Sequence, residues 1–498
     1  MPPTLALYDA TAARTLDQRA TAELGGDAYE LMRRAGRAAW HCALRNWPQA
    51  QRIVVVCGPG NNGGDGYVFA RLALEAGRNV RVVRLPEHSP TSEIATRARD
   101  EYRQRNGRVE AFVDVLPPAD LLVDALFGIG LSRAPDGAAK GLIEAMNAHP
   151  APCLALDAPS GVDGDRGAVP GIAVAATRTL EFIVPKPGLR TGAAIDLAGR
   201  LELAELQVSA QAFEGVDAHS ALLTPEALRN VLRPRRRDSH KGLSGRVLCL
   251  GGDHGSGGAI ALCADAALRS GAGLVDVATR EEHIGGLLAR RPEAMARAVE
   301  RSEDLAVQLQ HADVVAVGPG LGQNVWGRVL FGAALGADKP LVLDADALNL
   351  LAARERTQAL PFETILTPHP GEAGRLLGTT TADIQADRFG AARAIAERYD
   401  AIVVLKGAGT IVCAPSRRPG LVGAGNPGMA VAGMGDLLTG VIAAMRAQGF
   451  PAFDAACIGA LLHGAAGDEA AREGGERGLL PSDLLPRLRR LANPDYVR

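Results

Sequence analysis

The sequence lacks the residue patterns that mark several common kinds of site. Its seven cysteines are scattered singly without a Cys-x-x-Cys pair, and none of its ten histidines stands in a His-x-x-x-His spacing. A dithiol redox motif and a dedicated zinc site are therefore not indicated. Only five lysines occur, and no Gly-Lys dipeptide. This excludes a Walker A loop, so any phosphate chemistry must use another design.

Strong net charge and long apolar runs are also missing. The formal net charge is -2, with both signs spread along 498 residues, which gives no field to attract nucleic acid or an anionic membrane. No stretch approaches the roughly 20 apolar residues that span a bilayer, and the N-terminal segment lacks the features of a secretory signal. We therefore expect a cytoplasmic protein that binds small molecules, with no nucleic acid and no membrane as partner.

A repeated unit of apolar strand, glycine-rich turn and helix fills both halves of the chain. The first half contains RIVVVCGPG, VRVVRLP, DLLVDALFG and CLALDAPSG; the second contains RVLCLGG, DVVAVGPG, PLVLDADA, TILTPHPG and AIVVLKGAG. Such buried strands with helical crossovers predict an α/β protein with two doubly wound sheet domains. The strand-like runs lapse near residue 220, so we place the domains at residues 1–218 and 222–498.

The first glycine loop, CGPGNNGGDG at residues 57–66, follows a strand and opens a helix, where backbone N–H groups can hold a phosphate. A Gly-x-Gly-x-x-Gly match alone is a weak signal. The next strand ends in Arg84, where an ordinary dinucleotide site expects an acidic residue. Polar residues also end two later strands, at Asp124 and at Asp157 with Ser160. Any one of these turns could merely reverse the chain, but together they indicate a specialised site in one crevice.

The segments CGPGNNGGDG, DALFGIGLSR and LDAPSGVDGD resemble the Rossmann-like epimerase domain of the NAD(P)H-hydrate repair enzymes, over residues 1 to about 215. The resemblance implies that Asp157 is the acid/base group at the damaged nicotinamide ring. It also implies that a potassium ion is bound by Asn62, Asp124 and Ser160. The residues implied to bind the hydrated dinucleotide are Asn61, Asn62, Gly63, Gly64, Asp65, Gly128, Ile129, Gly130, Leu131, Ser132, Arg133, Ala134 and Asp157.

A second glycine-rich segment, GAGNPGMAVAGMGDLLTG at residues 423–440, holds one acidic residue, Asp436, where a helix-like run begins. The preceding backbone N–H groups and the helix N-terminus would form an anion cup beside this carboxylate. That arrangement suits phosphoryl transfer, with Asp436 taking the proton of an attacking hydroxyl. A helix N-cap role explains the Asp but not the glycines. Lys406, at the end of the strand AIVVL, adds a positive charge that could face phosphates.

The motifs SHKG, VGPGLG, DADALNLL, LTPHPGEAGRLLG, VVLKGAGT, GMGDLLTG and LLHGAAGD are similar to ribokinase-like folds. As a set they resemble the ADP- or ATP-dependent NAD(P)H-hydrate dehydratases, over residues 222–498. The resemblance implies substrate contacts from Ala259, Gly320, His369 and Asp436. It implies nucleotide contacts from Lys406, Gly407, Ala408, Gly409, Thr410 and Gly435. Glu372 stands where ribokinase relatives place an acidic residue near Mg²⁺, which we expect with the nucleotide.

The two resemblances together imply one bifunctional enzyme, an isomerase and lyase that forms a homo-oligomer. It would epimerise R- and S-NAD(P)HX, the hydrates of NADH and NADPH, and then dehydrate the S form. ADP or ATP would be the co-substrate, K⁺ would act in the epimerase domain, and AMP or ADP with phosphate would be released. Two alternatives remain open. The second domain could be a small-molecule kinase, since such kinases share the anion cup, and the first could bind a dinucleotide without chemistry.

Overall fold

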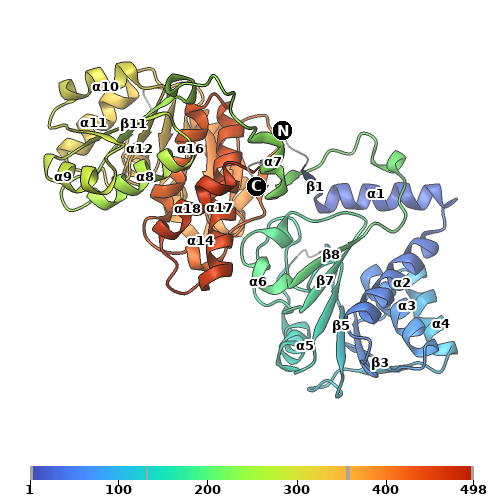
Figure 1. Cartoon of the computed structure of the whole chain (residues 1–498). Helices are drawn as coiled ribbons and strands as arrows, with labels where there is room; N and C mark the ends of the chain where they lie inside the picture. The colour runs from blue at the N-terminus through green and yellow to red at the C-terminus, as the bar shows by residue number, and fades with distance from the viewer. Residues whose placement is uncertain (1–3, 131–132, 355–358, 495–498) are drawn as a thin grey trace. The chain divides into compact units, whose positions relative to one another are not determined.

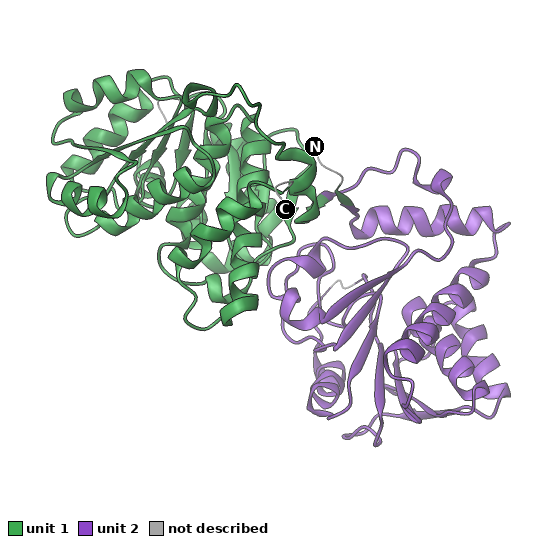
Figure 2. Ribbon diagram, viewed as in Figure 1, with its two compact units in different colours: residues 1–5, 221–498 green, residues 6–220 purple. Residues whose placement is uncertain are grey.

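The computed structural model describes residues 4–130, 133–354 and 359–494. The chain divides into two compact units, Ala6–Ser220 and Ala221–Arg498, with Met1–Leu5 grouped with the second (Figure 2). Each unit has its own central sheet and its own buried apolar core. Among the described residues, no helix combines the length and apolar character that a membrane span requires.

The N-terminal unit is built on seven parallel strands in the order β4-β3-β2-β5-β6-β7-β8. Because β2 has β3 on one side and β5 on the other, the strand order reverses at β2, and a crevice forms at the carboxyl ends there. The strands are β2 (Arg52–Cys57), β3 (Asn79–Arg84), β4 (Arg108–Ala111), β5 (Leu121–Ala125), β6 (Cys153–Leu156), β7 (Arg178–Phe182) and β8 (Arg200–Ala204).

Helices cover both faces of this sheet (Figure 1). Alternate residues of β2 point to opposite faces: Val55 joins the core beneath α2, α3 and α4, whereas Val54 and Val56 join the core beneath α5. The sheet is therefore doubly wound, and its central strands β2, β5 and β6 are mostly apolar because both of their faces are covered. The helices are α1 (Ala10–Glu23), α2 (Ala28–Asn46), α3 (Asn61–Glu75), α4 (Glu93–Gln104), α5 (Gly137–Ala148) and α6 (Ala194–Ala198).

The C-terminal unit carries a sheet of eleven strands in the order β1-β9-β18-β17-β16-β15-β14-β13-β10-β11-β12. It is parallel from β12 to β16, whereas β17 runs antiparallel to both its neighbours. The order reverses at β10, which lies between β11 and β13. The strands are β1 (Leu5–Leu7), β9 (Ser220–Leu223), β10 (Arg246–Leu250), β11 (Leu274–Thr279), β12 (Met295–Ala298), β13 (Val314–Val317), β14 (Leu341–Leu343), β15 (Ile365–Leu366), β16 (Ile402–Leu405), β17 (Ile411–Cys413) and β18 (Gly420–Val422).

The helix that follows the second glycine-rich segment, α16, lies deep in this unit and packs between α8 and α17. A Cβ added to Gly440 would overlap the carbonyl oxygen of Cys263 on α8, so the two backbones approach closely. This burial explains why residues 437–445 of α16 are almost all apolar. The helices are α7 (Glu226–Val231), α8 (Gly257–Arg269), α9 (Glu281–Arg290), α10 (Ala306–His311), α11 (Val325–Leu335), α12 (Ala345–Ala352), α13 (Pro370–Leu377), α14 (Thr381–Ala386), α15 (Arg388–Tyr399), α16 (Met434–Ala447), α17 (Ala452–Gly474) and α18 (Pro481–Leu491).

Candidate active sites

A cavity of about 850 Å³ lies at the carboxyl ends of the N-terminal strands, lined by the loops that follow β2, β5, β6 and β7. This is the crevice that the reversal of strand order at β2 creates. Nine of the predicted substrate residues line the cavity: Asn61, Asn62, Asp65, Gly128, Ile129, Gly130, Arg133, Ala134 and Asp157. The predicted residues Leu131 and Ser132 lie outside the described residues.

Gly63 and Gly64 are buried in the first turn of α3 rather than at the cavity wall. A Cβ added to Gly63 would overlap the carbonyl oxygen of Gly58, and one added to Gly64 would overlap the side chain of Met32. The two glycines therefore let α3 pack tightly beneath the loop. Their contact with substrate stays a prediction.

Asp157 follows β6 in a left-handed conformation, with φ at 67°. Its Oδ1 accepts hydrogen bonds from the Lys186 ammonium group and from the Phe182 N–H, the latter at 3.2 Å. Lys186 is 1% exposed, and its Nζ also donates to the Phe182 carbonyl at 2.8 Å. A strained backbone that is held by specific contacts is characteristic of a functional position. The structure thus supplies Asp157 with a buried cationic partner at the cavity wall.

Two further carboxylates, Asp17 and Asp65, line the same cavity as Asp157. Burial, followed by the charges of Asp157 and Asp17, raises the pKa of Asp65 well above its usual value. Desolvation and then the charge of Asp157 raise the pKa of Asp17. Carboxylates whose pKa values are raised by burial and by neighbouring charges are characteristic of functional sites. The cavity therefore combines three acidic groups with the Lys186 ammonium group.

The three predicted potassium ligands lie close together, with Asn62 at the cavity wall. Both oxygens of the buried Asp124 carboxylate accept bonds from Ser160, at 2.6 Å from its hydroxyl and 2.7 Å from its N–H. Burial raises the pKa of Asp124 to about 6. The Ser160 hydroxyl also lies 3.2 Å from the Phe127 carbonyl oxygen, to which the Asn62 amide donates at 3.0 Å. The buried Oδ1 of Asn62 has no hydrogen-bond partner in the structure.

In the C-terminal unit, Asp436 lies in the first turn of α16, as the sequence predicts. The helix starts after Gly433, whose φ of 90° suits glycine. Burial and the charge of Asp344 raise the pKa of Asp436 to about 6, against the opposing charge of Lys406. A carboxylate with this pKa is ionised at neutral pH and can still accept a proton in a reaction, which is what a general base requires.

Lys406 follows β16, and its ammonium group lies beside the start of α16. A Cβ added to Gly435 would lie 3.2 Å from its Nζ. The Nζ donates to Asp344 at 2.6 Å and lies 3.7 Å from Glu372. The Asp344 carboxylate also accepts a bond from the Thr439 hydroxyl of α16 at 2.9 Å. The ends of β14 and β16 are thereby joined to the glycine cup at the start of α16.

The predicted nucleotide loop continues from Lys406 as a glycine-bearing bend. Gly407 and Gly409 have φ values of 130° and 63°, which side-chain-bearing residues rarely adopt. The Thr410 hydroxyl donates to the Gly407 carbonyl at 3.2 Å, which closes the bend, and Ala408 is exposed between the two glycines. An exposed backbone of this shape offers N–H groups to an anion.

His369 caps α13 and is held in place by Glu372. Its Nδ1 accepts a bond from the Gly371 N–H at 2.9 Å, while the backbone N–H of His369 donates to the Glu372 carboxylate at 2.7 Å. Burial and the charge of Lys406 lower the pKa of His369. Burial raises the pKa of Glu372 to about 7 despite the opposing charge of Lys406. His369 therefore stands neutral and oriented beside the Lys406 site.

The predicted substrate residues Ala259 and Gly320 lie side by side, since a Cβ added to Gly320 would be 3.3 Å from the Ala259 Cβ. The Gly320 carbonyl accepts a bond from the Asp253 N–H at 2.6 Å. A Cβ added to Gly433 would lie 2.7 Å from Leu262, one turn beyond Ala259 on α8. The loops that follow β10 and β13 therefore meet near the start of α16.

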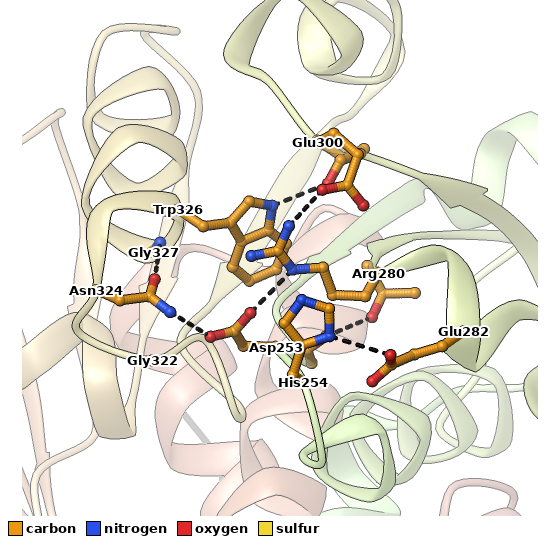
Figure 3. A network of polar contacts seen from close by, with 12 residues as sticks. Asp253, His254, Arg280, Glu282, Glu300, Gly322, Asn324, Trp326 and Gly327 are labelled. Carbon is orange, nitrogen blue, oxygen red and sulfur yellow. Dashed lines mark hydrogen bonds and ion pairs between the residues drawn. The ribbon is translucent and has the colours of Figure 1, made fainter.

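A polar network holds the β10 loop in this position (Figure 3). The Asp253 carboxylate accepts bonds from Arg280 at 2.9 Å and from Asn324 at 2.7 Å. The Arg280 guanidinium lies over the Trp326 ring, 4.3 Å from its centroid, and also pairs with Glu300. The network ties the loop to α11 and to the ends of β11 and β12, so it fixes the wall that carries Gly320.

Comparison with known proteins shows to which family the chain belongs. A family profile described as YjeF-related protein N-terminus matches residues 28–188, and one described as NAD(P)H-hydrate dehydratase matches residues 247–490. The bifunctional NAD(P)H-hydrate repair enzyme Nnr of Escherichia coli K12 is 44% identical over 482 residues, covering 97% of this chain and 93% of the relative. The bifunctional NAD(P)H-hydrate repair enzyme Nnr of Coxiella burnetii is 45% identical over 489 residues, covering 98% of this chain and 99% of the relative. This chain belongs to the family of bifunctional NAD(P)H-hydrate repair enzymes.

Solved structures agree with the predicted fold of this repair-enzyme chain. A ribokinase-like superfamily protein of Enterococcus faecalis is 30% identical with a TM-score of 0.51, covering 54% of this chain and 94% of the neighbour. A hypothetical protein of Streptococcus mutans is 33% identical with the same TM-score of 0.51, covering 54% and 98%. The prediction of an α/β protein from this family, with a ribokinase-like second domain, is confirmed.

Sequence reasoning missed several residues that complete the two sites of this repair-enzyme chain. Asp17 lies within α1, where no glycine turn marks it. Lys186 follows β7 and Asp344 stands in the motif DADALNLL, but the contacts of these residues depend on partners 29 and 62 residues away, respectively. A charged residue at a strand end was the signal available for both.

Proposed function

We propose that the N-terminal unit interconverts the R and S epimers of NAD(P)HX and that the C-terminal unit dehydrates the S epimer, consuming ADP or ATP. The meeting of Lys406, Gly435 and Asp436 at the start of α16 carries the second assignment. A cation, a set of backbone N–H donors and a base at one point are the parts that phosphoryl transfer requires. Family membership supports both assignments.

In the dehydratase step, Asp436 takes the proton of the C6 hydroxyl as that oxygen attacks the terminal phosphorus of the nucleotide. The bond from this phosphorus to the bridging oxygen breaks, so ADP leaves as AMP, or ATP as ADP. The ring nitrogen lone pair then expels phosphate from C6, and loss of the adjacent proton restores the dihydronicotinamide. Neither step changes the oxidation state of the ring. Lys406 and the cup at Gly435 stabilise the charge of the transferring phosphoryl group.

In the epimerase step, Asp157 moves the proton that opens and closes the bond at C6. Interconversion of the epimers requires either the C6–O or the C6–N1 bond to break, and both routes need a proton donor and acceptor at the ring. Lys186 holds the Asp157 carboxylate in position from the buried side. The neighbouring Asp65 and Asp17 lie close enough to Asp157 for its charge to raise their pKa values.

The oxygen-rich cluster of Asn62, Asp124 and Ser160, which reaches the epimerase cavity at Asn62, fits a potassium ion. The buried, unpartnered Oδ1 of Asn62 is the observation that supports this assignment, since such an atom lacks a donor in the protein. Asn62, Asp124 and Ser160 would hold the ion with hard oxygen ligands. Its positive charge would offset part of the charge of the dinucleotide pyrophosphate. In the dehydratase, Glu372 is the carboxylate beside Lys406 that would contact nucleotide-bound magnesium.

One experiment separates this function from a small-molecule kinase with the same cup. Purified protein is incubated with mixed R and S hydrates, with and without ADP, while nicotinamide absorbance and inorganic phosphate are followed. The repair reaction restores the absorbance of NADH or NADPH and releases one phosphate per product, only when ADP or ATP is present. A kinase would instead accumulate a stable phosphorylated product without free phosphate. That outcome would remove the dehydratase assignment.

A further inference from the structure

The largest fully buried side chain in the described part of the protein lies next to the Lys406–Thr410 loop. It is Arg388, the first residue of α15, with a relative exposure of 0%. Burial lowers the pKa of Arg388 to about 10, so the group stays charged at neutral pH. A buried charge is retained only where specific partners satisfy it. The partners of Arg388 therefore indicate what the side chain does.

Three of these partners are backbone carbonyls of the proposed nucleotide loop and its strand. Arg388 Nη2 donates to the carbonyl oxygens of Leu405 at 3.4 Å, Lys406 at 3.3 Å and Gly409 at 3.3 Å. Arg388 Nη1 donates to the side chain of Gln385 at 2.8 Å. One guanidinium group thus spans both ends of the glycine bend.

The orientation of the N–H groups of the loop follows from these contacts and from peptide geometry. In a trans peptide the C=O and N–H groups point in opposite directions. Because the Lys406 and Gly409 carbonyls face the guanidinium, the N–H groups of Gly407 and Thr410 point away from it. A Cβ added to Gly407 would lie only 3.0 Å from Arg388 Nη1, so the guanidinium packs directly against the bend.

We propose that Arg388 is the positioning residue of the nucleotide site. It holds the loop carbonyls inward, so that the Gly407 and Thr410 N–H groups and the Lys406 ammonium group face the nucleotide phosphates. Arg388 acts through the loop and is not itself a catalytic residue. This inference rests on the proposed function, in which residues 406–410 hold ADP or ATP.

The test uses the full chain and steady-state dehydration of S-NAD(P)HX, with Arg388→Met and Arg388→Lys. Methionine fills the space without donors, while lysine keeps the charge but lacks the planar fork that reaches several carbonyls. For Arg388→Met we expect KM for ADP to rise at least about tenfold, the loss typical of a hydrogen bond to a charged group. The kcat at saturating ADP should stay within about threefold, because the loop contributes binding rather than the reacting base. The KM of Arg388→Lys for ADP should lie between those of the parent and of Arg388→Met.

Arg393→Met is the matched control, since Arg393 is an exposed arginine on the same helix. It should leave KM for ADP unchanged. Gln385→Ala removes the exposed acceptor that orients the guanidinium, and it should raise KM for ADP about two- to threefold, as expected for loss of a modest hydrogen bond. A purely structural role for Arg388 would instead lower the active fraction, reducing kcat with KM for ADP unchanged.

Comparison with Lys406→Ala separates the failure of this inference from the failure of the proposed function. An unchanged KM for ADP in folded Arg388→Met, with a raised KM in Lys406→Ala, would overturn the positioning role and leave the nucleotide site in place. Unchanged KM values in both variants would refute the placement of the nucleotide site itself. Should Arg388→Met fail to fold, Gln385→Ala decides: a raised KM supports the inference, and an unchanged KM overturns it.

Discussion

At the scale of single residues, each proposed site contains a carboxylate that is mostly shielded from solvent and lies near a lysine. Asp436 lies in the buried first turn of α16, near Asp344 and Lys406. Asp157 lies at the end of β6, bonded to a lysine that is 1% exposed. A buried carboxylate is costly unless charged or hydrogen-bonding partners compensate for it, and Asn keeps the shape of the side chain while removing the charge. Substitution by Asn therefore distinguishes chemistry from structure in each site.

Asp436→Asn should reduce ADP-dependent dehydration of S-NAD(P)HX by at least about a hundredfold, the lower range for loss of a general base. An amide keeps the shape of the side chain but cannot take the hydroxyl proton. Calorimetric ADP affinity and the rate of epimerisation should be close to those of the parent. Loss of ADP binding, or a much lower melting temperature, would show that Asp436 is mainly a structural cap.

The pH dependence of dehydration should follow the raised pKa of Asp436, about 6. Only the deprotonated carboxylate accepts a proton, so kcat/KM should fall as the pH is lowered through about 6, by about tenfold per unit on the acid side. Rates measured from pH 5 to pH 8 at fixed ionic strength check this. The residual rate of Asp436→Asn should lack that acid limb, and a parent profile that stays flat across the range would contradict the assignment of the base.

Asp157→Asn should slow the repair of the R epimer while the S epimer is still dehydrated at the parent rate. The amide retains the size of the side chain but neither pairs with Lys186 as a charge nor shuttles a proton. Repair of each epimer is measured at times that are short compared with spontaneous epimerisation. Equal rates for R and S in the variant would remove Asp157 from the mechanism.

At the scale of elements, the position of the proposed base Asp436 depends on how closely α16 packs. Gly440 contacts the backbone of α8 at Cys263, where a Cβ has no space. The same helix carries Gly435 and Asp436 at its start, so any shift of its axis moves the anion cup. The glycines of this segment thus have two separate purposes: those at the start leave the backbone open, and Gly440 permits helix contact.

Gly440→Ala should destabilise the C-terminal unit by about 1–3 kcal/mol, the usual cost of overpacking a core, and it should reduce dehydration. The clash is with backbone, which cannot rotate away as a side chain can. Gly332→Ala on the exposed side of α11 is the control, since a Cβ there meets nothing within 4 Å. The control should be neutral or stabilising, as alanine favours helix. Differential scanning calorimetry of both variants checks this, and a parent-like Gly440→Ala would disprove the packing argument.

At the scale of the whole molecule, the chain consists of two units with separate sheets and separate cores. The epimerase cavity is lined entirely by residues of the N-terminal unit, and the contacts around Asp436 come from the C-terminal unit. The residues proposed for each step therefore belong to a single unit, so each step can be removed by a substitution in its own unit.

An equimolar mixture of Asp157→Asn and Asp436→Asn chains should repair the R epimer, although each variant alone repairs it slowly or not at all. S-NAD(P)HX made by the intact epimerase of one chain diffuses to the intact dehydratase of the other. The measurement is the recovery of nicotinamide absorbance. In the mixture each kind of intact site is present at half its concentration in the same amount of parent enzyme. A mixture that stays inactive, with both single activities present, would show that the substrate does not exchange between chains.

The sequence by itself determined the α/β architecture, the family and the position of Asp436 at the start of a helix. These features are local, because apolar runs, glycine turns and a helix start each depend on residues that are consecutive in the chain. Asn61, Asn62 and Asp65 were also predictable as cavity residues, because the turn after β2 must lie at the reversal of strand order.

Only the tertiary structure decided which partners these residues have. Asp344 follows β14 and Lys406 follows β16, and the two strands flank β15, so the ion pair depends on strand order rather than on spacing in the chain. The same holds for Lys186 with Asp157, which joins the loops after the neighbouring strands β7 and β6. Arg388 reads as an ordinary helix residue in the sequence. Its burial beneath the Lys406 loop arises from the packing of α15 against β16, a long-range contact that no local pattern encodes.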